Sequence, residues 1–168
     1  MAHFGKLTVA ALGVLGLIAA GSTTALASER NGVLQFGSMV GVHGAAVGTV
    51  NNRGITGGGL PWVIASGRGE VDRTGEVTVR VKGLVIPVAP FNGTNPAPTF
   101  GAVVSCVTTG HVIVNVSTAQ FLANMAGDST IDGMVALPHP CNNPIVFVIG
   151  PNGAWFARSS AEDEGSDG

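Results

Sequence analysis

The sequence predicts an all-β fold: one antiparallel β-sandwich or small barrel, built from hairpins and closed by one probable disulfide. Valine and isoleucine are prominent among the 45% hydrophobic residues, which favours strands over helices. Short apolar segments recur between turns rich in Gly, Pro and Asn, a spacing typical of sandwiches and barrels. The two cysteines supply the even count that a single disulfide needs.

The clearest predicted strand is Glu76–Lys82, in which valines alternate with polar residues as in a sheet with one face in water. The turn residues before it, Asp72 to Gly75, predict a hairpin with a three-residue loop closed by a left-handed glycine. The predicted cross-strand pairs are Asp72 with Glu76, Val71 with Val77, Gly69 with Val79, and Gly67 with Val81. The two glycines leave room beside the valines for bulky residues of another layer.

Two further hairpins share this turn formula. Their turns are Val107 to Gly110 and Gly150 to Gly153, each with glycine in the fourth position. The predicted pairs are Cys106 with Val112, Val104 with Val114, Ile149 with Trp155, and Val148 with Phe156. Cys106 is therefore expected to face the core, and the third hairpin, apolar on both faces, to be central or covered on both sides.

The remaining segments are assigned from shorter patterns. Strands are expected over Val33–Val40, Ala45–Val50, Trp62–Ser66 and Thr130–Leu137. One helical turn is expected over Gln120–Ala126, with Thr118 as its cap. Pro87–Pro98 is expected to be a surface loop.

The chain begins with the features of a cleavable secretory signal. Lys6 precedes an apolar run that is shorter than a membrane span, and Ala25-Leu26-Ala27 matches the small-residue cleavage pattern. The prediction is a signal peptide at 1–27, one β-sandwich domain at 28–159 and a disordered acidic tail at 160–168. Loss of Lys6 leaves seven basic against ten acidic residues. A net charge of about −3 argues against nucleic acid and anionic membrane surfaces as partners.

Cys106 and Cys141 are expected to form a disulfide, because an even cysteine count in an exported protein indicates one. The alternative reading is a zinc site that adds His111 and His139 to the two cysteines. It is disfavoured because neither Cys-x4-His nor His-x-Cys matches the usual spacing of zinc ligands. No metal and no cofactor are therefore expected.

The sequence predicts no catalytic site. The carboxylates of Glu70, Asp72 and Glu76 lie at and beside a tight turn, where water screens them. Ser66 lacks the G-x-S-x-G pattern of a nucleophile elbow, and Gly57-Gly58-Gly59 lacks the lysine of a phosphate loop. A protein that is not an enzyme is the expectation.

One candidate ligand site lies on the other face of the first hairpin. Its register places Arg68 directly opposite Arg80, Ser66 opposite Lys82, and Trp62 opposite Ile86. Like charges across a ladder repel each other unless an anion lies between them. The predicted ligand surface is an arginine clamp with Lys82 nearby and Trp62 as an aromatic platform. The alternative is a solvated strand pair with its apolar end under a loop.

The stretch from Gly32 to Phe156 resembles small secreted proteins of Gram-positive-type bacteria that carry no assigned activity. The resemblance rests on Gly57-Gly58-Gly59-Leu60-Pro61-Trp62, on Val104-Ser105-Cys106, and on Pro140-Cys141 followed by Pro144-Ile145-Val146-Phe147-Val148. The expected function is extracellular binding, or a surface or structural role, with an extracellular ligand or an envelope component as partner. The alternative is a secreted protease inhibitor that presents the Pro87–Pro98 loop.

Overall fold

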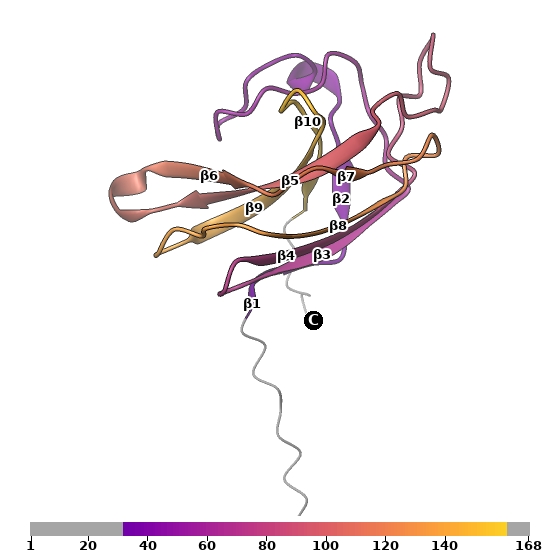
Figure 1. Ribbon diagram of the computed structural model, residues 1–168. Coiled ribbons are helices and arrows are strands. Elements are labelled where there is room, and N and C mark those ends of the chain that lie inside the picture. Colours follow the sequence, from indigo (N-terminus) through magenta and orange to yellow (C-terminus); the bar gives the residue numbers. More distant parts are fainter. Residues whose placement is uncertain (1–31, 161–168) are drawn as a thin grey trace, which may run out of the picture.

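A computed structural model describes residues 32–160 of the chain. Two antiparallel sheets pack face to face in it, which confirms the predicted all-β, sandwich-like fold (Figure 1). The strands are β1 (Gly32–Phe36), β2 (Met39–Gly41), β3 (Ser66–Asp72), β4 (Glu76–Lys82), β5 (Thr99–Val107), β6 (Ile113–Ser117), β7 (Phe121–Leu122), β8 (Ser129–Met134), β9 (Asn142–Ile149) and β10 (Trp155–Ser159). Two short 3-10 helices are η1 (Gly44–Ala46) and η2 (Thr109–His111). The predicted signal peptide and the tail beyond Ser160 lie outside the described residues.

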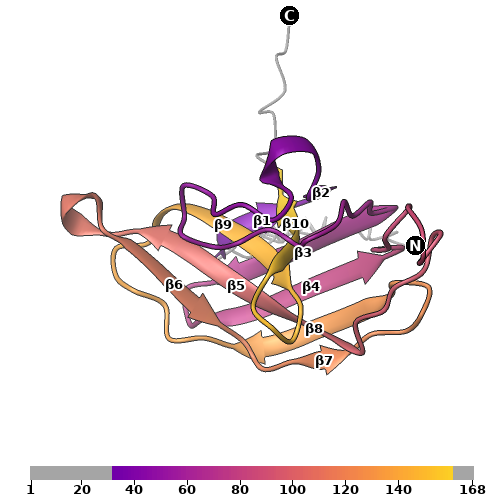
Figure 2. The same cartoon turned by 90° about the horizontal axis from the view of Figure 1, so that it is seen from above.

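The four-stranded sheet, here sheet A, has the order β1-β3-β4-β8, and the six-stranded sheet B has the order β2-β10-β9-β5-β6, with β7 also paired to β5. The predicted strand Val33–Val40 is in fact two strands, since the chain leaves sheet A after Phe36 and enters sheet B at Met39. Figure 2, seen from above, shows the β5–β6 hairpin projecting beyond the rest of the sandwich. Among residues 32–160, no helix has the length and apolar character that a membrane crossing requires.

The first hairpin has the predicted register. Val71 pairs with Val77, Gly69 with Val79, Arg68 with Arg80, and Gly67 with Val81. Gly75 adopts φ +93° and its N–H donates to Asp72 O at 3.2 Å, as the turn residues predicted. The space beside Gly67 is filled from the opposite sheet, as expected, whereas the space beside Gly69 is filled by Phe36 of β1, in the same sheet. A Cβ atom on Gly67 would lie 2.6 Å from Met39 Cγ, and one on Gly69 would lie 2.8 Å from the ring of Phe36.

The second hairpin has a longer loop than predicted. Cys106 pairs with Val114 instead of Val112, and Val104 pairs with Val116 instead of Val114. The cause is the wider turn: Thr108 N–H donates to Val112 O, and two consecutive residues inside it, Gly110 and His111, have positive φ. Because the shift is two residues, it preserves the alternation of faces, and Cys106 points into the core as expected.

The third hairpin matches the prediction at its first pair only. Ile149 pairs with Trp155, but Val148 pairs with Ala157 instead of Phe156, because a β-bulge lies between Trp155 and Ala157. Strand β9 lies between β10 and β5, as its apolar faces indicated.

Four of the shorter predictions need correction. Trp62–Ser66 is not a strand: Val63 forms an isolated bridge to Val85, and β3 begins only at Ser66. Ala45–Val50 is not a strand: it contains the end of η1 and a turn, with Gly48 at φ +68°. The expected helix over Gln120–Ala126 is the two-residue strand β7 and a turn. Its expected cap, Thr118, instead accepts a hydrogen bond from Ala102 N–H of β5. Strand β8 covers most of the predicted strand over Thr130–Leu137 but ends at Met134.

The core between the sheets is made mainly of valines on the inner faces. Sheet A contributes Val71, Val77, Val79, Val81 and Ile131, and sheet B contributes Ala102, Val104, Cys106, Val146 and Val148, all fully buried. Three aromatic side chains close one end: Trp62 stacks on Phe156 at 4.0 Å between ring centroids, and Phe100 meets both edge-on.

The loop between η1 and β3 covers the outer face of sheet B, and Arg53 anchors it there by hydrogen bonds (Figure 1, the purple segment above β5 and β10). The Arg53 guanidinium is buried and donates to Ser105 O and Oγ of β5 and to Asn143 O of β9, the last at 2.8 Å. Asn115 of β6 donates to Arg53 O at 2.8 Å. Burial lowers the pKa of Arg53 from its ordinary value. Since this loop covers sheet B, the outer face of sheet A is the open face of the sandwich.

Candidate functional site

The outer face of sheet A is open and almost entirely polar. Alternate residues of its strands point away from the valine core. The side chains on this face, exposed or half-buried, are Ser66, Arg68 and Glu70 of β3, Glu76, Thr78, Arg80 and Lys82 of β4, and Thr130, Asp132 and Met134 of β8. The predicted ligand residues Arg68, Arg80 and Lys82 all lie here.

Arg68 and Arg80 are directly opposed in the β3–β4 ladder and are both exposed. Neither guanidinium makes a hydrogen bond or an ion pair within residues 32–160, where the one ion pair joins Lys82 to Asp128. Two like charges in a direct cross-strand pair destabilise a sheet. The register therefore places two arginines opposite each other, with no ion pair to either side chain within residues 32–160.

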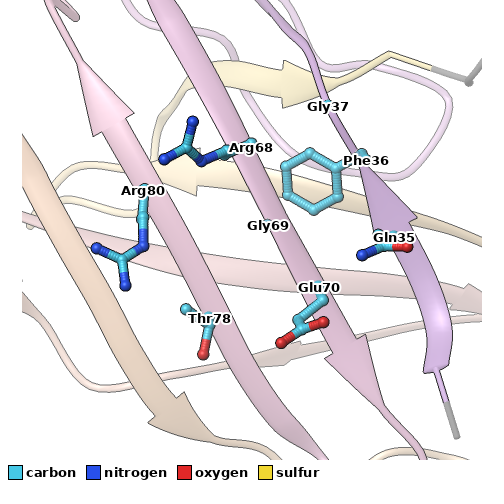
Figure 3. A pocket seen from close by; sticks show the side chains of 8 residues that line it. All are labelled: Gln35, Phe36, Gly37, Arg68, Gly69, Glu70, Thr78 and Arg80. Carbon is cyan, nitrogen blue, oxygen red and sulfur yellow. The ribbon is translucent and has the colours of Figure 1, made fainter. Parts of the chain in front are cut away.

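Two hollows flank this arginine pair. One, of about 370 Å³, is lined by Gln35, Phe36, Gly37, Arg68, Gly69, Glu70, Thr78 and Arg80 (Figure 3). The other, of about 350 Å³, is lined by Gly37, Ser66, Gly67, Arg68, Arg80, Val81, Lys82, Asp128, Ser129 and Thr130. Both volumes lie in the range of small-ligand sites. The arginine pair borders both hollows, so a ligand in either hollow lies beside Arg68 and Arg80.

Lys82 is less available than the sequence indicated. Its Nζ lies 3.2 Å from Asp128 Oδ2, and Asp128 Oδ1 accepts a hydrogen bond from Gly83 N–H at 3.0 Å. The Gly83 N–H and the Lys82 ammonium lower the pKa of Asp128. Asp128 thus ties the turn before β8 to the end of β4 and compensates the charge of Lys82.

Replacing Asp128 with asparagine is expected to flatten the acid side of the stability curve. The lowered pKa means that the ionised carboxylate stabilises the folded state. This contribution is complete above about pH 5 and is lost as the pH falls below about 4. Melting temperatures of the wild type and D128N should differ most near pH 7 and converge near pH 3. D132N, which removes another carboxylate of the same face, is the control. Equal melting temperatures at pH 7 would contradict the assignment.

Trp62 does not belong to this surface, contrary to the prediction. Val63 pairs with Val85, so the register that placed Trp62 opposite Ile86 continues beyond β3 and β4. The faces exchange at Gly83, whose φ of +63° turns the strand so that the residues after it reverse their orientation. Trp62 is only 4% exposed and stacks on Phe156 in the core.

Gln35 and Gly37 are lining residues that the sequence reasoning missed. They come from β1 and the chain just after it, which join sheet A through pairing with β3, about 35 residues away in sequence. The segment 33–40 reads as one apolar strand, and no local signal shows that it pairs with β3. The register of β3 and β4 places Glu70 on this face, but its position in the hollow depends on β1.

The disulfide prediction is confirmed. Cys106 and Cys141 are bonded, with Cα atoms 4.8 Å apart and a sequence separation of 35 residues. Both sulfurs are thus engaged with each other and not with a metal together with His111 and His139. Within residues 32–160 no three His, Cys, Asp or Glu side chains are grouped for metal binding.

The Pro87–Pro98 loop folds back on itself. Ile86 and Thr94 form an antiparallel bridge, and Gly93 N–H donates to Ile86 O at 2.8 Å. At its base the buried Asn95 side chain donates to Ala97 O and Asn124 O. The loop is therefore a closed turn held by its own hydrogen bonds, and it projects from the sandwich in Figure 1.

The polar outer face of sheet A, with its arginine pair, is the feature of the structure that indicates a function. The predicted resemblance to small secreted bacterial proteins stays a prediction. Comparisons of the chain with models of protein families, with curated proteins and with solved structures found no match.

Proposed function

We propose that this domain is a non-enzymatic extracellular binding module that holds an anionic group of its ligand between Arg68 and Arg80. The observation that carries the proposal is the opposed arginine pair, which has no carboxylate partner within residues 32–160 and borders two hollows. Two like charges held opposite each other conflict with the usual preferences of strand pairing, and such conflicts tend to mark functional sites. An anion between the guanidiniums would replace repulsion by charge-assisted hydrogen bonds.

The proposed location follows from two features. The N-terminal segment has the charged, apolar and small-residue regions of a secretory signal. The Cys106–Cys141 disulfide is compatible with an oxidising compartment, where such bonds form and persist. Both support export of a domain that begins near Ser28.

The alternative, a protease inhibitor, has less support. Strand-like recognition of a loop by another protein needs an extended backbone with free hydrogen-bonding groups. In the Pro87–Pro98 loop the backbone groups of Ile86, Gly93 and Thr94 bond to each other instead. The open face of sheet A, in contrast, offers charge and volume for a ligand.

The double variant R68S/R80S is expected to lose anion binding and to keep its fold. We expect inorganic phosphate to bind the wild type with a Kd of about 1–10 mM, which is modest because the site is open. Loss of two charge-assisted contacts should weaken binding at least tenfold. The free energy of unfolding should stay the same or rise by about 0.2–1 kcal/mol, since the repulsion is removed.

The measurement is a two-dimensional amide NMR titration with sodium phosphate at constant ionic strength. The wild type should show shifts at Gly67, Gly69 and Val81. R73S/R158S is the matched control, because it also removes two exposed arginines, one at the hairpin turn and one on sheet B. Unchanged phosphate binding in R68S/R80S would rule out the site. Unfolding of that variant would show that the arginines are structural.

A further inference from the structure

The hollow on the β1 side of the arginine pair is lined by both positively and negatively charged side chains. Arg68, Arg80 and Glu70 line the same hollow, with Thr78 between Arg80 and Glu70 in the view of Figure 3. The Glu70 side chain is exposed and, like the two guanidinium groups, makes no hydrogen bond or ion pair within residues 32–160. One hollow thus carries both a positive and a negative site, and neither is neutralised by the other.

Arg68 and Glu70 are neighbours on one face of β3, yet no ion pair joins them. Arg68 and Glu70 are two residues apart on one strand, so their Cα atoms are about 6.6 Å apart and their side chains point to the same face. Thr78, which is opposite Glu70, places a neutral side chain beside the carboxylate. A ligand with only negative charge would gain from the arginines and be repelled by Glu70.

The second hollow does not offer the same pattern. Its carboxylate, Asp128, already accepts hydrogen bonds from Lys82 Nζ and Gly83 N–H. A cationic group on a ligand would have to displace Lys82 there. The unpaired carboxylate beside the arginine pair lies on the β1 side, at Glu70.

We infer that the ligand is zwitterionic: its anionic group lies between Arg68 and Arg80 and its ammonium group contacts Glu70, whose Cα atom is roughly 6–7 Å from that of Arg68 along β3. This inference rests on the proposed function, because it takes the arginine pair as the anion site. It adds the second recognition group and the ligand length. With its two charges spaced as the Cα atoms of Arg68 and Glu70 are, the ligand is longer than an α-amino acid, whose charges lie closer together.

The test is a length series of ω-amino carboxylates, from glycine to 6-aminohexanoate, each compared with the alkanoate that lacks the amine. Each added methylene lengthens an extended ligand by roughly 1.3 Å, given C–C bonds of about 1.5 Å. We expect 5-aminopentanoate to bind about two- to fivefold more tightly than pentanoate, as an exposed ion pair provides. Glycine should show no gain over acetate.

Two variants locate the cation site. E70Q should abolish the preference for 5-aminopentanoate over pentanoate and leave or improve the binding of pentanoate. D132N is the matched control, because it removes a carboxylate of the same sheet face that does not line the hollow, and it should keep the preference. A parallel pair, O-phosphoethanolamine and ethyl phosphate, shows whether phosphate serves as the anion as well as carboxylate does.

The outcomes separate the two proposals. If phosphate, alkanoates and amino carboxylates all fail to shift the amides around Arg68 and Arg80, the anion site itself is wrong. If these anions bind but the amine gives no gain at any length, or if E70Q retains the gain, the zwitterion inference is overturned and the anion site stands. A gain that peaks near five carbons and disappears in E70Q supports the inference.

Discussion

Replacing Trp62 with alanine should lower the free energy of unfolding by about 3–5 kcal/mol, the usual cost of deleting a buried aromatic side chain. Trp62 is buried, stacks on Phe156 with ring planes 13° apart, and meets Phe100 edge-on. Urea denaturation followed by circular dichroism measures the loss. V63A, which shortens the neighbouring and 47% exposed side chain, should cost far less. A loss below about 1 kcal/mol in W62A would contradict the packing described.

A milder substitution of Trp62 tests whether this residue belongs to the core or contacts the ligand of the arginine pair. W62F keeps an aromatic ring against Phe156, so it should fold and should bind phosphate as the wild type does. If Trp62 were instead a platform for the ligand, W62F would weaken binding without a comparable loss of stability. Because Trp62 is buried, we expect W62F to change the stability more than the phosphate binding. The phosphate titration and urea denaturation together test this expectation.

Removal of the disulfide is expected to lower the free energy of unfolding by about 3–4 kcal/mol, from the entropy of a roughly 35-residue loop in the unfolded chain. The bond ties the connection between β8 of sheet A and β9 of sheet B to β5. For a domain of this size the melting temperature should fall by about 10–15 °C.

Thermal unfolding with and without reductant measures this effect, and C106A/C141A gives the same comparison without reductant. Alkylation of the untreated protein should leave both cysteines unmodified. Two reactive thiols in the absence of reductant would contradict the bond. An unchanged melting temperature after complete reduction would show that the connection is held by packing alone.

The sequence by itself determined the features that depend on neighbouring residues. The first hairpin has its predicted register because Asp72 caps the turn, Gly75 supplies the left-handed residue and the valines of β4 alternate without interruption. The opposition of Arg68 and Arg80 follows from that register alone. The disulfide followed from the cysteine count and the expected compartment, and it needed no spatial information.

Only the tertiary structure decided which face each segment presents. The register brought Val63 opposite Val85, but this strand pair exchanges its faces near Gly83, whose φ is positive, and Trp62 lies in the core. The burial of Arg53 depends on oxygen atoms of Ser105 and Asn143, on strands far away in sequence. Likewise the hollow beside the arginine pair exists because β1 pairs with β3, which places Gln35 beside Glu70 and Gly37 at the edge of the same hollow. Such contacts join residues that are distant in the chain, so no local pattern encodes them.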